Sequence, residues 1–180
     1  TTDSHIVSPL FFPGGDIGSL AVHGTVNDLS VCGAKPLYLS AGFILEEGFA
    51  LSDLERIVGS MAEAAAKAGV SIVTGDTKTV PRGSGDGIFI NTYGIGICEY
   101  AGNLSVKEIR QGDAILVDGT IGDHGAAILN ARESLCLDSE IASDSAPLNG
   151  LVGDILQASP HIRCMRDATR GGLGAILAEM

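Results

Sequence analysis

The sequence predicts a mixed α/β (α+β) fold built as two units. Apolar runs of strand length alternate with segments of helical spacing through the first hundred residues. A polar stretch with a Gly-Asp turn, residues 103–113, then separates this half from a second series of the same kind. We therefore predict one domain over residues 1–103 and the first part of a second domain over residues 104–180.

The first unit opens with a predicted strand over residues 1–7, which contains Asp3, and a helix over residues 17–32. The apolar face of this helix is expected to hold small and aliphatic residues at offsets of three and four: Leu20, Ala21, Gly24, Val31 and Cys32. Asp28 falls on the same face. A carboxylate in such a stripe is costly to bury unless something pairs with it.

An apolar strand over residues 37–44 leads to the clearest helix, over residues 52–68. Ser52 and Glu55 match a capping box, and Gly69 is a good C-terminal stop. The expected buried stripe of this helix is Leu54, Ile57, Val58, Met61, Ala65 and Ala68.

The first unit is completed by two more strands. The first, over residues 70–74, runs into Gly75 and Asp76, so that Asp76 is expected where the strand ends. A turn-rich loop over 81–87 and a strand over 88–97 follow.

The second unit is predicted from shorter signals. In order, we expect a strand (114–117), a glycine-rich run (119–125), a helix (126–132), a loop (139–146), a helix (151–158) and a short strand (163–165). Asp167 then precedes a Gly-Gly helix start. The chain begins without Met and ends inside an apolar, helix-like run, which is what a piece of a longer protein would show.

The composition of the chain argues against several classes of function. The net charge of −11 argues against binding to nucleic acid or to an anionic membrane, and a phosphate ligand would need a divalent cation as intermediary. The four cysteines form no C-x-x-C pair, which favours reduced thiols in the cytoplasm. There is also no apolar run of membrane-spanning length.

Aspartates are the candidate site residues. Alone, Asp3, Asp28, Asp76 and Asp167 each fit a structural role, as a strand-end, buried, turn or helix-cap carboxylate. Together they fit a magnesium–nucleotide site, because Mg²⁺ takes one or two carboxylates plus phosphate oxygens and water. Lys78, two residues after Asp76, would add a charge on a phosphate, or else be a solvated loop lysine.

Other common sites find no support in the sequence. The four histidines (His5, His23, His124 and His161) lack metal-ligand spacing, so a zinc site is not predicted. Neither a P-loop nor a G-x-G-x-x-G run is present. Any nucleotide site must therefore be of another type.

Seven sequence runs resemble the HypE family of hydrogenase-maturation carbamoyl dehydratases. They are TTD (1–3), FPGGDIG (12–18), GTVNDL (24–29), GAKPL (33–37), FILEEG (43–48), GDTK (75–78) and DATRGGL (167–173). Some of these runs are similar to those of the wider superfamily of aminoimidazole ribonucleotide synthetase, selenophosphate synthetase and thiamine-phosphate kinase. The FPGGDIG and GDTK runs point to the hydrogenase branch.

The resemblance implies a two-domain fold of the aminoimidazole ribonucleotide synthetase type. Its first domain forms a homodimer through its sheets and binds ATP with Mg²⁺ near that interface. Carried over by motif, the cofactor-binding residues would be Asp3, Asn27, Asp28, Gly75, Asp76, Lys78 and Asp167. The same match makes Asp3, Asp28, Asp76 and Asp167 the metal ligands, with Asp28 and Asp76 catalytic.

The resemblance also implies a reaction and partners. In the family, a carbamoyltransferase loads a carboxamide onto a C-terminal cysteine, ATP activates the amide oxygen, and loss of phosphate leaves a thiocyanate. The cyanide passes to iron on a hydrogenase scaffold complex. This sequence lacks the family's N-terminal phosphate loop and its terminal cysteine, so we expect it to be incomplete for the whole reaction.

Two alternatives remain open at this stage. The first is another enzyme of the superfamily, such as selenophosphate synthetase, which would carry a cysteine or selenocysteine in an N-terminal glycine-rich loop. The second is a non-catalytic scaffold that offers its acidic face to a basic partner. A scaffold would show no Mg²⁺-dependent nucleotide binding.

Overall fold

The computed structural model describes residues 1–133 and 140–180. In chain order the elements are β1 (Thr2–His5), β2 (Phe11–Phe12), β3 (Gly15–Asp16), α1 (Ile17–Val31), β4 (Ala34–Glu46), α2 (Leu51–Ala68), β5 (Ser71–Val80), β6 (Ile88–Cys98), the 3₁₀ helix η1 (Val106–Glu108), α3 (Asp123–Glu133), α4 (Asn149–Ala158) and α5 (Gly172–Glu179). The mixed α/β prediction is confirmed.

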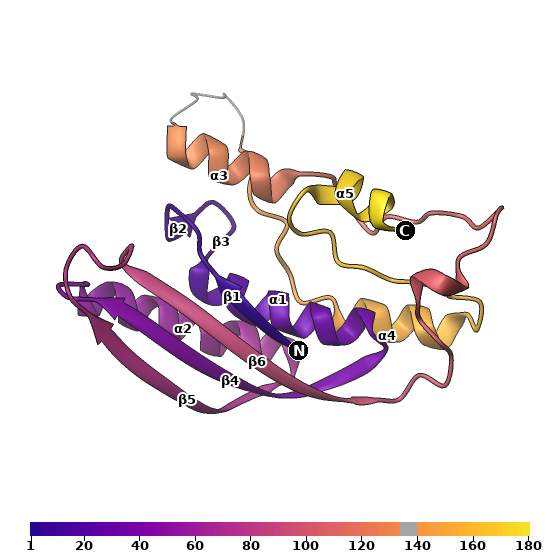
Figure 1. Cartoon of the computed structure of the whole chain (residues 1–180), viewed down its shortest axis with the longest axis horizontal. Helices are drawn as coiled ribbons and strands as arrows, with labels where there is room; N and C mark the ends of the chain where they lie inside the picture. Colours follow the sequence, from indigo (N-terminus) through magenta and orange to yellow (C-terminus); the bar gives the residue numbers. More distant parts are fainter. Residues whose placement is uncertain (134–139) are drawn as a thin grey trace.

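A four-stranded sheet organises the first half of the chain. Its order is β1-β6-β4-β5, with β4 antiparallel to β6 and parallel to β5. Helices α1 and α2 lie along one face of this sheet, and α3 and α5 lie beyond them (Figure 1). The core between sheet and helices is aliphatic, with Ile17, Leu39, Ile57 and Ile90 almost fully buried.

Helix α1 is buried on more than one side, contrary to the single stripe predicted for it. Leu20 and Gly24 are only partly buried and Cys32 is exposed, whereas Ile17, Val22 and Val26 are fully buried. The reason is that α1 packs on the sheet and on α2, while α4 covers it from another side. A helix enclosed in this way has no single polar face to mark its orientation.

Helix α2 follows its predicted stripe except at Val58, and its predicted cap is wrong. Ile57, Met61 and Ala65 are buried, but Val58 is exposed. The capping box at Ser52 is wrong, because the helix begins at Leu51 after Ala50, which makes no side-chain cap. Gly69 does end the helix, in the left-handed conformation with φ of 68°.

Three strand predictions are wrong. Strand β5 continues through residues 75–80, so Asp76 lies inside a strand rather than at its end. Residues 114–117 and 163–165 form no strand. Ile115 and Leu116 are 67% and 85% exposed, because no neighbouring backbone in the described ranges pairs with this segment.

The two faces of the sheet differ in what covers them. Register partners share a face, so the side chains that alternate with the buried ones point away from the helices. These outward residues include large apolar ones that are about half exposed: Tyr38, Ile44, Tyr93, Ile95 and Ile97. Within residues 1–133 and 140–180, nothing covers this face.

One predicted loop and one cysteine lie partly or wholly outside the described residues. The predicted loop at 139–146 is irregular over 140–146, and Ser139 lies outside the described residues, as does Cys136. The other cysteines, Cys32, Cys98 and Cys164, are free thiols. In the ranges described, every helix is too short or too polar to span a bilayer.

Candidate functional site

Asp3 and Asp28 lie side by side where β1 runs along α1. Asp28 Oδ2 accepts a hydrogen bond from Thr1 Oγ1 at 2.9 Å. Asp3 Oδ1 accepts from the backbone N–H of Ser4 at 2.8 Å, and its Oδ2 is 3.5 Å from His5 Nε2. Both carboxylates act electrostatically on the buried His5 ring, which places them in one local field.

Asp167 joins this pair from the second half of the chain. Burial raises the pKa of its carboxyl group, and the charges of Asp28 and Asp3 raise it further. The positive charge of Arg166 lowers the pKa of Asp167, but this effect is smaller than the combined effects that raise it. Electrostatic coupling therefore relates three of the four predicted aspartates, from β1, α1 and the loop before α5.

The three carboxylates give this part of the molecule a concentration of negative charge. Within the described ranges, no three acidic, histidine or cysteine groups are arranged as a ready-made metal cage. Such a donor set fits Mg²⁺ better than a resident structural metal, because Mg²⁺ keeps several waters and takes other ligands from substrate phosphates. The residues present therefore fit a metal that arrives with a nucleotide.

Asp76 and Lys78 lie apart from these three carboxylates. Asp76 is paired in register with Gly42 and therefore projects from the outward face of the sheet, whereas Asp3 faces α1. Lys78 Nζ lies 2.8 Å from Asp76, and this ion pair holds the pKa of Asp76 below its ordinary value. Both side chains are about 70% exposed (72% and 69%), so the pair contributes little to stability.

Gly75 has a packing role in the structure. A Cβ atom at this position would collide with the backbone carbonyl of Ala41 on β4. Glycine is thus needed for β5 to lie close to β4, and this requirement alone explains the residue. A direct contact of Gly75 with a nucleotide is not needed to account for it.

Asn27 holds the two halves of the chain together. Its Oδ1 accepts from the N–H of Leu148 at 2.8 Å, and its Nδ2 donates to the carbonyl of Ala146 at 3.0 Å. The side chain thereby acts as a backbone-like partner for a segment about 120 residues away. Its two polar atoms are engaged there rather than with Asp28.

We expect Asn27→Ala to lower the free energy of unfolding by about 2 kcal/mol, because two hydrogen bonds worth roughly 1 kcal/mol each are lost. Urea unfolding would measure the change. Asn103→Ala, which removes an exposed bond to Glu108, is the matched control and should have a much smaller effect. Equal stabilities of wild type and Asn27→Ala would contradict this role.

Two buried histidines were not predicted as notable. His5 lies against Asp3, and His23 lies on α1 beneath the segment over residues 140–148, where its Nδ1 is 3.0 Å from Ser145 Oγ. His23 Nε2 is buried without a hydrogen-bond partner in the described residues. Neither residue has a spacing signal in the sequence, because their hydrogen-bond partners, Thr92 for His5 and Ser145 for His23, lie far along the chain.

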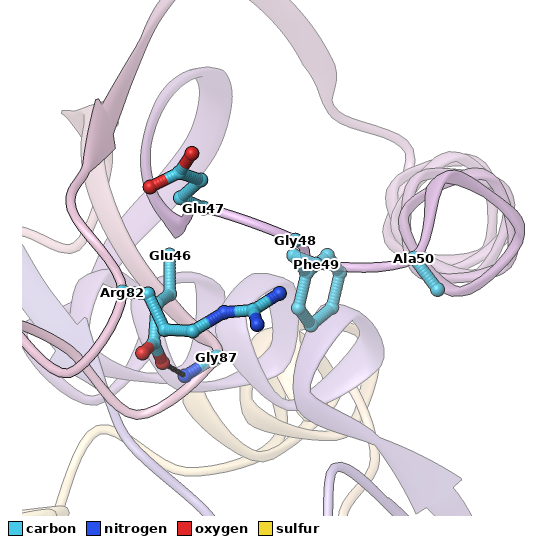
Figure 2. Close-up of a pocket in the computed structure, with 7 residues that line it drawn as sticks. All are labelled: Glu46, Glu47, Gly48, Phe49, Ala50, Arg82 and Gly87. Atoms are coloured by element: carbon cyan, nitrogen blue, oxygen red, sulfur yellow. Dashed lines mark hydrogen bonds between the residues drawn. The ribbon is translucent and has the colours of Figure 1, made fainter.

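A pocket of about 410 Å³ lies farther along the sheet, where β4 ends and the β5–β6 loop returns (Figure 2). Glu46 accepts hydrogen bonds from the N–H groups of Gly83 and Gly87, which lowers the pKa of its carboxyl group. The Arg82 side chain crosses the pocket toward Phe49, while Glu47 points away (Figure 2). None of the predicted aspartates lines this pocket, so it is not the predicted nucleotide site.

Comparison with known proteins adds family information to this geometry. The model of the AIR synthase related protein, N-terminal domain, matches residues 1–98. The model of the AIR synthase related protein, C-terminal domain, matches residues 110–180.

Curated relatives match along the chain. Carbamoyl dehydratase HypE of Azotobacter vinelandii is 62% identical over 179 residues, which is 99% of this chain and 52% of that protein. HypE of Escherichia coli (strain K12) is 52% identical over 179 residues, 99% of this chain and 53% of that protein. The chain thus spans about half the length of the curated relatives it matches.

Solved structures agree with the fold described above. A HypE–HypF complex matches with a TM-score of 0.97 and 59% identity, over 99% of this chain and 59% of that one. HypE in complex with ATP matches with a TM-score of 0.96 and 55% identity, over 99% and 53%. Thiamine monophosphate kinase from Aquifex aeolicus, at 20% identity, a TM-score of 0.63 and coverage of 87% and 55%, supports the fold alone.

Proposed function

The chain belongs to the family of AIR synthase related proteins, and from this premise we propose that it is the ATP-binding part of a hydrogenase-maturation carbamoyl dehydratase. The reaction we propose for the whole enzyme is ATP-dependent dehydration of an S-carboxamide to a thiocyanate. The proposal rests on one observation: the charges of Asp3 and Asp28 both act on the carboxyl group of Asp167. Sequence identities of 52–62% to carbamoyl dehydratases support the choice of branch within the superfamily.

Mg²⁺ is the cation that this site would take. Asp3, Asp28 and Asp167 would hold it, and it would neutralise charge on the phosphates of ATP. The aspartates supply hard oxygen donors on three separate elements, so they would also fix the orientation of the triphosphate. The raised pKa of Asp167 indicates that its charged form is unfavourable in the protein alone. A bound cation would stabilise that charged form.

The proposed chemistry is a phosphoryl transfer followed by elimination. The carboxamide oxygen attacks the γ-phosphorus, the bond to the β-phosphate oxygen breaks, ADP leaves, and one of the two N–H protons is lost to give an imidate phosphate. The remaining N–H proton and the phosphate are then lost, which leaves a carbon–nitrogen triple bond on sulfur. Asp28 is proposed to position the phosphates. Asp76 and Lys78 project from the outward face of the sheet, so they are proposed to reach a phosphate only across the homodimer, with Lys78 as a point charge.

The other proposed site residues act indirectly. Asn27 holds the backbone of residues 146–148 beside Asp28, and Gly75 keeps β5 close to β4. Both would therefore shape the site without touching the nucleotide. The proposed partners are a carbamoyltransferase, supported by the HypE–HypF complex, and an iron-carrying hydrogenase scaffold complex.

Isothermal titration calorimetry with ATP, with and without Mg²⁺, tests the proposal. We expect Mg²⁺-dependent binding of one nucleotide per chain. A non-catalytic scaffold would bind no nucleotide, and such a result would refute the proposal. AMP serves as the control ligand, since it lacks the phosphates on which the cation would act.

Lys78→Ala should weaken Mg-ATP binding by a few-fold and leave the fold intact. The fold should survive because the Lys78–Asp76 ion pair is exposed. Calorimetry measures the affinity, and a thermal melt measures the stability. Arg82→Ala is the control, because Arg82 is also an exposed cation but lies on the β5–β6 loop rather than in β5. An unchanged affinity would mean that Lys78 is a solvated lysine only.

A homodimer is proposed to form through the outward face of the sheet. Tyr38, Tyr93, Ile95 and Ile97 make this face apolar, and burying it would remove apolar area from water. Light scattering should give twice the chain mass, and Ile95→Glu should give a monomer. Ile121→Glu, an exposed site in the second half, should leave the dimer intact. A wild-type monomer would contradict the proposal.

A further inference from the structure

His5 is the buried polar residue in closest contact with the carboxylate site. It lies two residues after Asp3 on β1, so both side chains point from the same face of the sheet toward α1. Its ring is 7% exposed. Helix α1 can approach only because residue 24 is glycine, since a Cβ there would lie 2.9 Å from His5 Cε1 and 3.2 Å from Asp3 Oδ2.

The two oxygens near His5 Nε2 favour the tautomer that carries its proton on that atom. Nε2 lies 3.3 Å from Thr92 Oγ1 and 3.5 Å from Asp3 Oδ2. The carboxylate oxygen can only accept, and Thr92 Oγ1, which is 3.2 Å from the carbonyl of Ala21, can accept as well as donate. An Nε2–H between these two oxygens fits both contacts.

The Asp3 carboxylate has a polar neighbour at each oxygen. The N–H of Ser4 donates to Oδ1 at 2.8 Å, and His5 Nε2 lies 3.5 Å from Oδ2, an electrostatic contact longer than an ordinary hydrogen bond. The side chain of Asp3 is 44% exposed. This arrangement fixes the direction of a carboxylate that is otherwise free to rotate, as second-shell donors do for metal ligands.

We propose that His5 is a positioning residue, whose Nε2–H holds Asp3 in the orientation that binds the Mg²⁺ of Mg-ATP. The inference rests on the proposed function for the metal but on the hydrogen-bond network for the orientation. It assigns His5 no contact with the nucleotide. The chain Ala21–Thr92–His5–Asp3 thereby links the middle of α1 to the site carboxylate.

Two substitutions separate positioning from simple filling of space. His5→Phe keeps the ring volume and removes the donor, whereas His5→Gln can place an amide N–H near the position of Nε2. We expect the Mg²⁺ concentration at half-maximal binding of a non-hydrolysable ATP analogue to rise about 10-fold in His5→Phe, the lower range for loss of a second-shell partner. His5→Gln should stay within about 3-fold of wild type.

His23→Phe is the matched control. His23 is also a buried histidine, but it lies on α1 and does not contact Asp3. It should change stability without moving the Mg²⁺ midpoint. A His5→Phe protein with the wild-type Mg²⁺ midpoint would overturn the proposal, whether or not its stability is lower than that of wild type. A wild type whose nucleotide binding ignores Mg²⁺ would instead count against the proposed function.

A crystal structure of the His5→Phe protein gives a readout that does not depend on metal. Asp3 should leave its present rotamer or become disordered, and an unchanged carboxylate would overturn the proposal. If His5→Phe does not fold, Thr92→Val tests the same chain of bonds. With the hydroxyl gone, Nε2–H has Asp3 as its acceptor, so the Nε2–Oδ2 distance should fall below 3.5 Å. A distance that stays the same or lengthens would overturn it.

Discussion

Replacing Asp28 with asparagine should weaken Mg-ATP binding by about 10-fold or more, the loss expected when a charged contact worth 1.4 kcal/mol or more is removed. Stability without ligand should hold or rise. Asp28 has no buried cation as a partner in the described ranges, and its one hydrogen bond, from Thr1, can be kept by the asparagine oxygen. The substitution also removes a negative charge that now raises the pKa of Asp167.

Thermal melts with and without Mg-ATP distinguish this result from a structural role for Asp28. A structural carboxylate with a buried partner should cost about 3 kcal/mol or more when it is neutralised. A destabilised Asp28→Asn protein that still binds Mg-ATP normally would therefore refute the site assignment. Asp118→Asn, at an exposed position in the second half, is the matched control and should alter neither quantity.

Acid should destabilise the protein through His23. Burial lowers the pKa of His23 from 6.5 to about 4, helped by the charge of Lys67 and opposed by that of Asp16. The folded state then binds fewer protons than the unfolded state, so this contribution is complete above pH 6.5 and is lost as the pH falls toward 4. Between pH 8 and pH 5 the loss amounts to about 2 kcal/mol.

The measurement compares urea unfolding of wild type and His23→Gln at several pH values. His23→Gln removes the titrating group, so its stability should fall by about 2 kcal/mol less than that of wild type between pH 8 and pH 5. Ser145→Ala removes the hydroxyl next to Nδ1 but keeps the imidazole, and should therefore keep most of the wild-type slope. Parallel pH curves for wild type and His23→Gln would show that folding does not lower the pKa of His23.

The fold could be predicted from sequence where one face of an element is buried. Helix α2 shows this, because the spacing of Ile57, Met61 and Ala65 and the stop at Gly69 define its orientation and end. Helix α1 does not, because it is covered on several sides. Its capping box, formed by Asp16 and Ser19, lay inside a glycine-rich motif and went unnoticed.

The site could be predicted only in part, and mainly through the family resemblance. The site formed by Asp3, Asp28 and Asp167 stays a prediction, supported by the effect of the first two charges on the third carboxyl group, whereas Asp76 projects from the opposite face of the sheet. A strand-end position was inferred from Gly75, whose real cause is close packing on Ala41. His5 was missed because its role depends on Thr92, 87 residues away, and on the missing side chain of Gly24.

The bonds that tie α1 to residues 145–148 also affect how the chain is made on the ribosome. His23 and Asn27 meet partners 119–122 residues later in the sequence. At about 5–20 residues per second, α1 emerges roughly 6–24 s before the segment that covers it has been synthesised. During that interval the side of α1 that residues 145–148 later cover is open to aggregation or to chaperones.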